Sequence, residues 1–114
     1  MIPLSHRKGI TRKEMMDLKV FFTLTGTNHY FGVDFLEPGM KIRLIKELDN
    51  EYDTEAIRVE YKGLGKIGYV ANSPHTVMGE SKSAGRLYDL FKKKAKGKVL
   101  VITSHGVLCE IKKR

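Results

Sequence analysis

Cysteine is nearly absent from this sequence of 114 residues, since Cys109 is the only one. A single cysteine excludes an internal disulfide and agrees with a reducing compartment. The sequence also lacks any apolar run near the roughly 18 residues that span a bilayer, and residues 1–16 lack the continuous apolar segment of a secretory signal. We therefore expect a cytoplasmic protein.

Motifs of catalysis and metal binding are missing as well. The four histidines show no pairing at two or four residues, and His105 and Cys109, whose spacing suits two zinc ligands, have no second pair to complete a tetrahedral site. The segment KGLGKIG lacks the Gly-Lys-Ser/Thr ending of a phosphate loop, and no nucleophile elbow is present. The sequence therefore predicts no catalytic residue, metal or cofactor. It predicts instead a turn histidine and a buried cysteine.

Positive charge is plentiful, with a net charge of +8, and it is concentrated at the two ends of the chain. Residues 1–20 carry five basic and two acidic groups, residues 21–91 carry eight and ten, and residues 92–114 carry eight and one. A basic flank attracts phosphate without regard to sequence, but it can equally keep a small protein soluble. Charge alone leaves both explanations open.

The length and the 41% hydrophobic content suit one compact domain. We predict an N-terminal extension over residues 1–19 and a single domain over residues 20–114. Within the extension, Thr11 and Glu14 could form a capping box at the start of a short helix.

Alternation of apolar and polar residues predicts strands in most of the domain. A β-branched and aromatic run begins at Val20, residues 40–44 alternate in polarity before residues 45 and 46 break the phase, and residues 57–61 place their apolar side chains on one face. A glycine-rich turn leads from there into residues 67–70, so the second, third and fourth strands should form a meander. Residues 98–113 give two apolar runs around a short turn, which predicts a final hairpin.

Residues 73–96 are predicted to be helical. Ser73 suits an N-cap because a proline follows it at the first helical position, although Gly79 should end or interrupt this segment. A second segment begins at Ser83 and places Lys92, Lys93 and Lys94 at its C-terminal end, where cations suit the helix dipole. The whole pattern predicts a mainly β (α+β) fold, a small OB-like or SH3-like β-barrel of about six strands with one or two short helices.

The stretch LDNEYDTEAIRVEYKGLGKIGYV, residues 48–70, is the most informative part of the chain. Its first turn surrounds Tyr52 with an amide and three acids: Asp49, Asn50, Glu51 and Asp53. Capping of turn amides explains Asn50 and one carboxylate. Alternatively, the tyrosine ring stacks on a base while a carboxylate accepts a hydrogen bond from a sugar hydroxyl. The residue chemistry leaves both alternatives open.

This stretch resembles the core motif of the HIRAN domain, which reads Asx-Asn-x-Tyr-Asp-x-x-Ala-Ile/Val-x-Val, then a hairpin, a basic residue, Ile/Val, Gly, Tyr/His and an aliphatic residue. The upstream segment LTGTNHYFGVDFLEPGMKIRLIKE resembles the family's opening strand, polar-aromatic loop and second strand, so the two matches cover roughly residues 21–72. The resemblance implies a modified OB-like barrel that recognises single-stranded DNA at its 3′-hydroxyl end, in DNA repair or processing. The expected partners are single-stranded DNA or DNA ends, and DNA-processing proteins.

The resemblance also implies a set of DNA-binding residues. Tyr52 would stack on the terminal base, and Asp53 would accept a hydrogen bond from the 3′-hydroxyl. The other residues would line the pocket, contact the base or phosphate, or close the opposite side: Asn50, Asp49, Asn28, His29, Tyr30 and Tyr69. Lys66 would attract phosphate.

The chain departs from the DNA-binding members in one loop. That loop carries an arginine and aromatic residues in those members but reads Asn28-His29-Tyr30 here, so one phosphate-binding cation is missing at Asn28. His29 replaces it only when protonated. Two alternatives stay open. One is a protein-recruitment module without a DNA pocket of its own, and the other is a hydrolase acting on acid anhydrides, through the family's association with helicases.

Overall fold

The computed structural model describes residues 19–112. Six strands, two 3-10 helices and one short α-helix are found in this part of the chain: β1 (Val20–Thr25), η2 (Thr27–His29), β2 (Lys41–Lys46), β3 (Ile57–Tyr61), β4 (Gly65–Val70), α2 (Ala84–Leu87), η3 (Tyr88–Leu90), β5 (Lys94–Thr103) and β6 (Gly106–Lys112). The extension predicted over residues 1–19, with its capping box at Thr11, lies outside the described residues except for Lys19.

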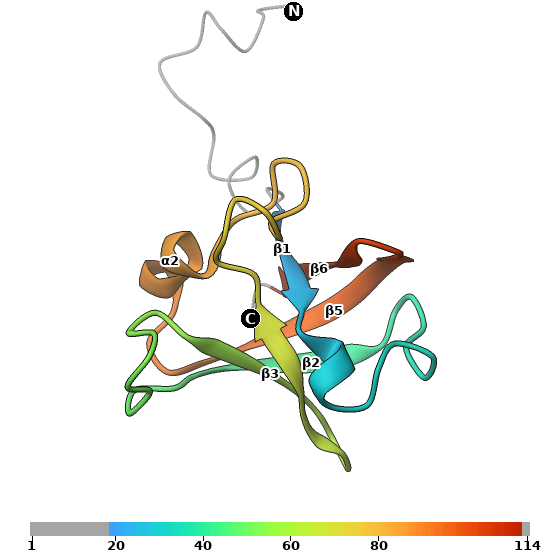
Figure 1. Ribbon diagram of the computed structural model, residues 1–114, viewed down its shortest axis with the longest axis horizontal. Helices are drawn as coiled ribbons and strands as arrows, with labels where there is room; N and C mark the ends of the chain where they lie inside the picture. Colours follow the sequence, from blue (N-terminus) through green and yellow to red (C-terminus); the bar gives the residue numbers. More distant parts are fainter. Residues whose placement is uncertain (1–18, 113–114) are drawn as a thin grey trace, which may run out of the picture.

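All six strands join in one closed antiparallel barrel, in the order β1-β4-β3-β2-β5-β6 (Figure 1). β2, β3 and β4 follow one another as the predicted meander, and β5 and β6 form the predicted last hairpin. β1 pairs with β4 on one side and with β6 on the other, which closes the barrel. The predicted small barrel of about six strands is therefore confirmed.

The strict alternation of β2 and β3 decides which side chains fill the barrel. Ile42 and Leu44 of β2 are buried, whereas Lys41 and Arg43, which alternate with them, are exposed. β3 continues the pattern, with Ile57 among the buried side chains. Successive side chains of a strand point to opposite faces. The polar residues that alternate with the core residues therefore lie on the outer surface of the barrel.

Gly68 is required by the close approach of β1 to β4. A Cβ atom at this position would lie 2.5 Å from the Thr25 carbonyl oxygen and 2.7 Å from the Leu24 Cδ1 atom. Neither the backbone oxygen nor the fully buried leucine can move away cheaply. The glycine in the KIGYV part of the motif therefore allows β1 and β4 to approach each other closely.

Residues 73–82 do not form the predicted first helix. Ser73 opens a single helical turn, since the Val77 amide donates to its carbonyl at 2.9 Å. The turn ends there because the Met78 amide donates instead to the hydroxyl of Thr23 on β1, at 3.0 Å. The same hydroxyl lies 2.8 Å from the Ser81 hydroxyl, so this segment is held to the barrel as a series of turns.

The second predicted helix exists but is shorter than expected. The helix begins at Ser83, as predicted, and this serine is its N-cap, whose side chain accepts a hydrogen bond from the Arg86 amide. The helical part nevertheless ends with η3 at Leu90, and Lys94 belongs to β5 and not to a helix C-terminus. The reason is that Lys94 already pairs with β2, and a strand ladder fixes the backbone in an extended conformation.

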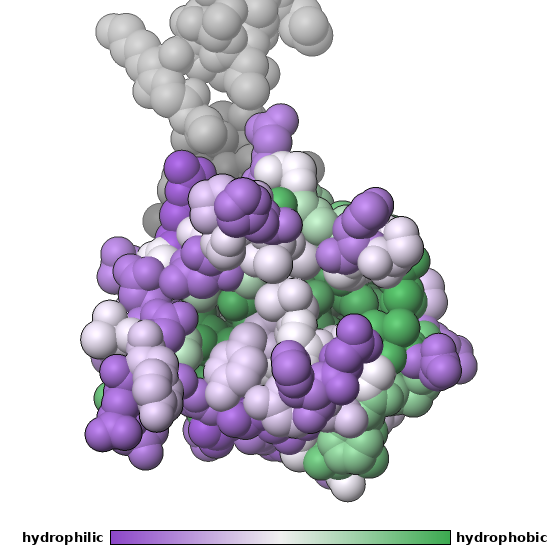
Figure 2. All heavy atoms as spheres, in the orientation of Figure 1, coloured by the Kyte–Doolittle hydropathy of each residue, from purple (hydrophilic) through white to green (hydrophobic). Residues whose placement is uncertain are grey.

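In Figure 2 hydrophilic side chains cover much of the visible surface, and apolar side chains show between them and along the right-hand side. None of the helices within residues 19–112 has the length and apolar character required to cross a membrane.

Candidate nucleic-acid interface

A network of polar and charged side chains centred on Glu47 joins the end of β2 to the outer face of β3 and β4. One Glu47 oxygen accepts hydrogen bonds from the Tyr69 hydroxyl at 2.8 Å and from the Asn50 side-chain amide at 3.0 Å. The other lies 3.0 Å from the Lys66 ammonium and 3.7 Å from the Arg58 guanidinium. Lys66 also donates to the Tyr69 hydroxyl at 2.7 Å. The five side chains therefore fix one another's positions.

The network determines the charges of its members. Burial raises the pKa of Glu47, but hydrogen bonds from Asn50, Lys66 and Tyr69 outweigh burial and hold that pKa below its ordinary value. The hydrogen bond to Tyr69, with the Glu47 carboxylate beside it, raises the pKa of Lys66 well above its ordinary value. Burial raises the pKa of Tyr69. At neutral pH the carboxylate and the ammonium are both charged, and the phenol keeps its proton.

The turn between β2 and β3, residues 47–56, is built around Asn50. Its side-chain oxygen accepts hydrogen bonds from the backbone amides of Tyr52 at 2.8 Å and of Asp53 at 2.9 Å, which is an Asx turn. Its side-chain amide donates to Glu47. One side chain thus shapes the turn and also ties it to the network on the barrel.

Tyr52 and Asp53 are presented outward by this turn. Tyr52 is 96% exposed, so its ring is not part of the core. One Asp53 oxygen accepts a hydrogen bond from the Glu55 amide at 2.8 Å, and within residues 19–112 no hydrogen bond engages the other oxygen. Asp49 is exposed in the same turn. An exposed aromatic ring and a half-buried carboxylate, with one oxygen that accepts no hydrogen bond within residues 19–112, therefore occupy adjacent positions.

The loop that follows β1 brings a second aromatic ring to the Glu47 network. Tyr30 lies with its ring centroid 6.4 Å from that of Tyr69, and the two rings are tilted by 55°. The Lys66 ammonium lies 5.6 Å from the Tyr30 centroid and 4.8 Å from the Tyr69 centroid, so it contacts both π faces. Asn28 and His29, in η2, are exposed beside Tyr30.

The predicted DNA-binding residues therefore fall into three groups. One group consists of Asn50, Lys66 and Tyr69, which contact Glu47, and of Tyr30, which contacts Lys66 and Tyr69. A second group is attached to the first through the Asn50 turn and consists of Tyr52 and Asp53. The third group is exposed, has no side-chain hydrogen bond or ion pair within the described part of the chain, and consists of Asn28, His29 and Asp49.

A cavity of about 310 Å³ lies away from all of these residues. It is found between β1, β6 and the segment of turns after β4, and Phe21, Met78 and Leu108 are among its lining residues. None of the predicted DNA-binding side chains lines this cavity.

The candidate zinc pair is separated by the barrel wall. His105 is exposed in the turn between β5 and β6, whereas Cys109 is fully buried, and burial raises the pKa of its thiol to about 12. The predicted turn histidine and buried cysteine are confirmed. Among residues 19–112, no three histidine, cysteine or acidic side chains gather closely enough to hold a metal ion.

A family model for the HIRAN domain matches residues 18–101 of this sequence. The chain belongs to the HIRAN domain family. HIRAN domains are nucleic-acid-binding modules. A comparison with curated proteins finds no significant match.

The barrel of this HIRAN domain is also similar to two solved structures. One is the HIRAN domain of human HLTF, with a TM-score of 0.57 and 18% identity over 82% of this chain and 72% of that chain. The other is a protein from Lactobacillus plantarum, with a TM-score of 0.52 and 22% identity over 84% of this chain and 98% of that chain. Both comparisons support the same fold.

The sequence alone did not point to Glu47, Arg58 or Phe31 in this HIRAN domain. The sequence could have indicated Glu47, because its position continues the row of residues 41, 43 and 45, whose side chains point outward, by one step beyond the end of β2. Phe31 follows Tyr30, is 52% exposed, and lies with its ring 6.4 Å from that of Phe35. It therefore adds a further accessible ring to the loop after β1.

Proposed function

We propose that this HIRAN domain binds the 3′-hydroxyl end of single-stranded DNA, through the 47–56 turn and the loop after β1, in DNA repair or processing. The observation that carries the proposal is the solvent-exposed ring of Tyr52 beside the half-buried Asp53 carboxylate, one oxygen of which accepts no hydrogen bond within residues 19–112. The ring stacks on the terminal base, and that oxygen accepts a hydrogen bond from the terminal hydroxyl.

The exposed rings supply the stacking energy. A tyrosine that packs on nothing gains no burial energy in the free protein, whereas stacking a base on it contributes about 1 to 3 kcal/mol. Tyr30 and Phe31 are also exposed and lie on the neighbouring loop. Stacking does not depend on base identity, so the domain should bind DNA ends of any sequence.

The charge of the turn selects an end over an internal nucleotide. From position 47 to position 55 every second residue is acidic: Glu47, Asp49, Glu51, Asp53 and Glu55. Glu47 is compensated by Lys66 and Arg58, but no cation within residues 19–112 forms an ion pair with the other four. Carboxylates repel a phosphate and accept a hydrogen bond from a hydroxyl, so an unphosphorylated terminus is the part of a strand that fits.

Lys66 supplies a positive charge next to this acidic turn. Its ammonium lies within cation–π distance of the rings of Tyr30 and Tyr69 and is charged at neutral pH. A strand that stacks on the exposed rings would bring its last internal phosphate toward this cation. The side chains of Asn28 and His29, beside Tyr30, offer further polar contacts to the same strand.

The test compares two single-stranded oligonucleotides that differ only in carrying a 3′-hydroxyl or a 3′-phosphate. Fluorescence anisotropy should show tighter binding of the hydroxyl form by the wild-type protein. Tyr52→Ala should weaken binding of the hydroxyl form roughly five-fold or more, because one stacked base is lost. Asp53→Asn should reduce the preference between the two ends.

Leu48→Ala is the matched control, since Leu48 is an exposed apolar side chain at the base of the same turn. It should leave both affinities unchanged. Equal binding of the two oligonucleotides by the wild-type protein, or full affinity in Tyr52→Ala, would show that the turn does not bind DNA ends. Partner capture that survives nuclease treatment, without any DNA binding, would favour the recruitment alternative.

A further inference from the structure

We propose that the outer surface of β2, β5 and β6 is a second nucleic-acid-binding surface, which binds the phosphate backbone of a duplex. Its six cations come from three neighbouring strands and are here called the basic face: Lys41, Arg43, Lys94, Lys96, Lys98 and Lys112. The proposal goes beyond the end-binding turn and does not depend on it.

Strand register places the cations of the basic face directly opposite one another. Lys41 pairs with Lys98, and Arg43 pairs with Lys96. Lys96 also pairs with Lys112 on its other side, so it has a cation on each neighbouring strand. Directly paired residues of antiparallel strands have Cβ atoms about 4.5 to 5.5 Å apart and point to the same face. Like charges at this separation destabilise a sheet.

Few acidic groups offset this repulsion. β2 and β5 contain no acidic residue, and β6 contains only Glu110. Glu110 lies 3.4 Å from Lys98, and Glu60 of β3 lies 3.6 Å from Arg43 but is shared with Arg58 at 2.7 Å. Within residues 19–112, the other four cations of the basic face form no ion pair. Anions from a ligand would relieve the remaining repulsion.

The basic face has the composition of a surface that contacts phosphates and not bases. The strands that form it, β2, β5 and β6, contain no aromatic residue. Surfaces that bind unpaired strands combine cations with rings on which bases stack. Cations without rings suit a duplex, whose bases are already stacked on one another and whose phosphates are exposed.

The size of the basic face matches several consecutive phosphates. Lys94, Lys96 and Lys98 alternate along β5, so they span about 13 Å, and the three strands together are about 10 Å wide. One strand of a duplex carries a phosphate about every 3.4 Å along its axis. The surface can therefore contact a few neighbouring phosphates of one duplex segment.

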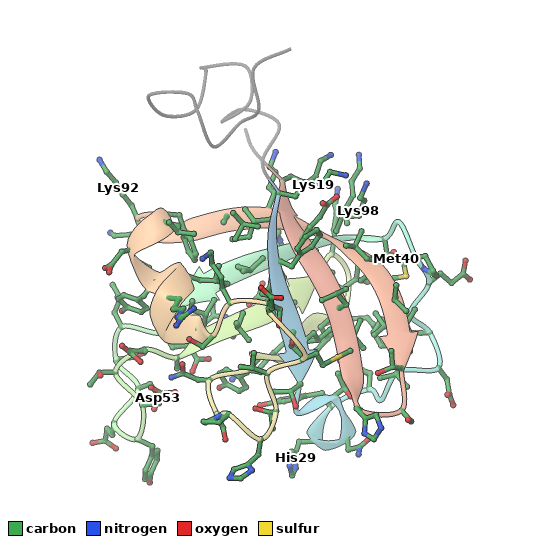
Figure 3. The ribbon with its side chains drawn as sticks, turned by 90° about the horizontal axis from the view of Figure 1, so that it is seen from above. Lys19, His29, Met40, Asp53, Lys92 and Lys98 are labelled. Carbon is green, nitrogen blue, oxygen red and sulfur yellow. The ribbon has the colours of Figure 1, made fainter. Side chains whose placement is uncertain are left out.

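The Lys98 end of the basic face lies away from the tip of the acidic turn. Figure 3 shows Lys98 and Lys19 on one side of the molecule and Asp53 and His29 on the opposite side. A duplex on the basic face would therefore leave the acidic turn accessible.

The test measures binding of a short blunt-ended DNA duplex with 3′-phosphates on both strands, which removes the terminal hydroxyls. The double variant Lys41→Gln/Lys96→Gln should weaken duplex binding about ten-fold at low salt. It should also lower the slope of log affinity against log salt by about two, one for each lost phosphate contact. Neither substitution leaves an acidic residue of the described chain without its cation.

The matched control is Lys62→Gln/Arg86→Gln, which removes the same net charge at exposed positions outside β2, β5 and β6. This control should retain nearly the wild-type duplex affinity and salt slope. Equal weakening by the two double variants would show that only net charge matters, and wild-type affinity in Lys41→Gln/Lys96→Gln would show that duplexes bind elsewhere. Either result overturns the proposal.

The experiment also separates this proposal from the end-binding function. Tyr52→Ala should bind the phosphate-capped duplex as the wild type does, and Lys41→Gln/Lys96→Gln should still prefer a single-stranded 3′-hydroxyl over a 3′-phosphate. If Tyr52→Ala loses duplex binding as well, the duplex contacts the turn and the basic face is not a separate surface.

Discussion

The acidic turn and the basic face are two charged regions of one barrel, and they are built in opposite ways. Glu47, at the base of the turn, has four partners that hold it in one position. Lys96, at the centre of the basic face, has cations opposite it on both neighbouring strands and no acidic partner within residues 19–112. The first arrangement fixes geometry, and the second leaves charge available for a ligand.

This contrast predicts different sensitivities to salt. Ordered hydrogen bonds among partly buried groups are screened little, whereas exposed charges lose most of their interaction beyond a Debye length of about 10 Å at 0.1 M salt. Recognition at the turn should therefore persist when salt is raised. Affinity contributed by the basic face should fall steeply.

The largest effect on this comparison is expected from Gly68→Ala, which disturbs the barrel on the side of the acidic turn. The added methyl group would collide with the Thr25 carbonyl, and overpacking of this kind costs about 2 kcal/mol. The loop that carries Tyr30 begins just after Thr25, so its contact with Tyr69 should be lost first. The urea concentration at the midpoint of unfolding should be lower than in the wild type. The preference for a 3′-hydroxyl over a 3′-phosphate should also decrease.

Duplex binding is the internal control for Gly68→Ala, because β5 makes no pairing with β1 or β4. The folded variant should retain most of its affinity for the phosphate-capped duplex. An unchanged urea midpoint would show that the two strands can separate at Gly68 without cost.

A smaller effect is expected from Glu47→Gln. It should lower the free energy of unfolding at pH 7 by about 1 to 2 kcal/mol, because Lys66 and Arg58 lose their common carboxylate. The pKa of Glu47 is lowered in the folded protein, so its stabilisation is complete above its ordinary value of 4.5 and is lost as pH falls through the lowered value. Urea unfolding of wild type and variant should therefore differ at pH 7 and converge below pH 4.5.

Glu51→Gln provides the matched control for this titration. Glu51 is an exposed acid in the same turn and forms no ion pair or side-chain hydrogen bond within residues 19–112. Its substitution should change stability little at any pH. A difference between wild type and Glu47→Gln that stays constant down to strongly acidic pH would contradict the role of the Glu47 charge.

The smallest effect is expected from Lys96→Gln, and it has the opposite sign. Lys96 pairs directly with Arg43 on one side and with Lys112 on the other. Removing its charge should stabilise the free protein by roughly 0.2 to 0.5 kcal/mol at low salt. Thermal unfolding at low and high salt measures this, and the gain should vanish at high salt because the repulsion is screened. Destabilisation of the variant at low salt would show that Lys96 is held by a favourable interaction in the free protein.

The barrel was predictable from the sequence because its strands obey a local rule. Residues 40–44 and 57–61 alternate so regularly that the sequence identifies their inward faces, and the glycine-rich turn identifies the hairpin between β3 and β4. The Asx turn at Asn50 was also predictable, since its hydrogen bonds reach only two and three residues along the chain.

The failures came from contacts between distant residues. The segment after Ser73 has a good helix start, but Thr23, more than fifty positions away, captures the Met78 amide. The Glu47 network likewise joins positions 22 residues apart, which alternation alone cannot pair. The excess of lysine near the C-terminus was visible, but its alignment with Lys41 follows only from strand register.

The pairing of Val20 with Ile111 places the two ends of the described barrel side by side. A short linker between these ends could therefore close the backbone into a ring or permit circular permutation at a surface turn. For the same reason, a larger polypeptide could carry the barrel as an insertion in one of its own loops, with little distance to bridge where the chain enters and leaves.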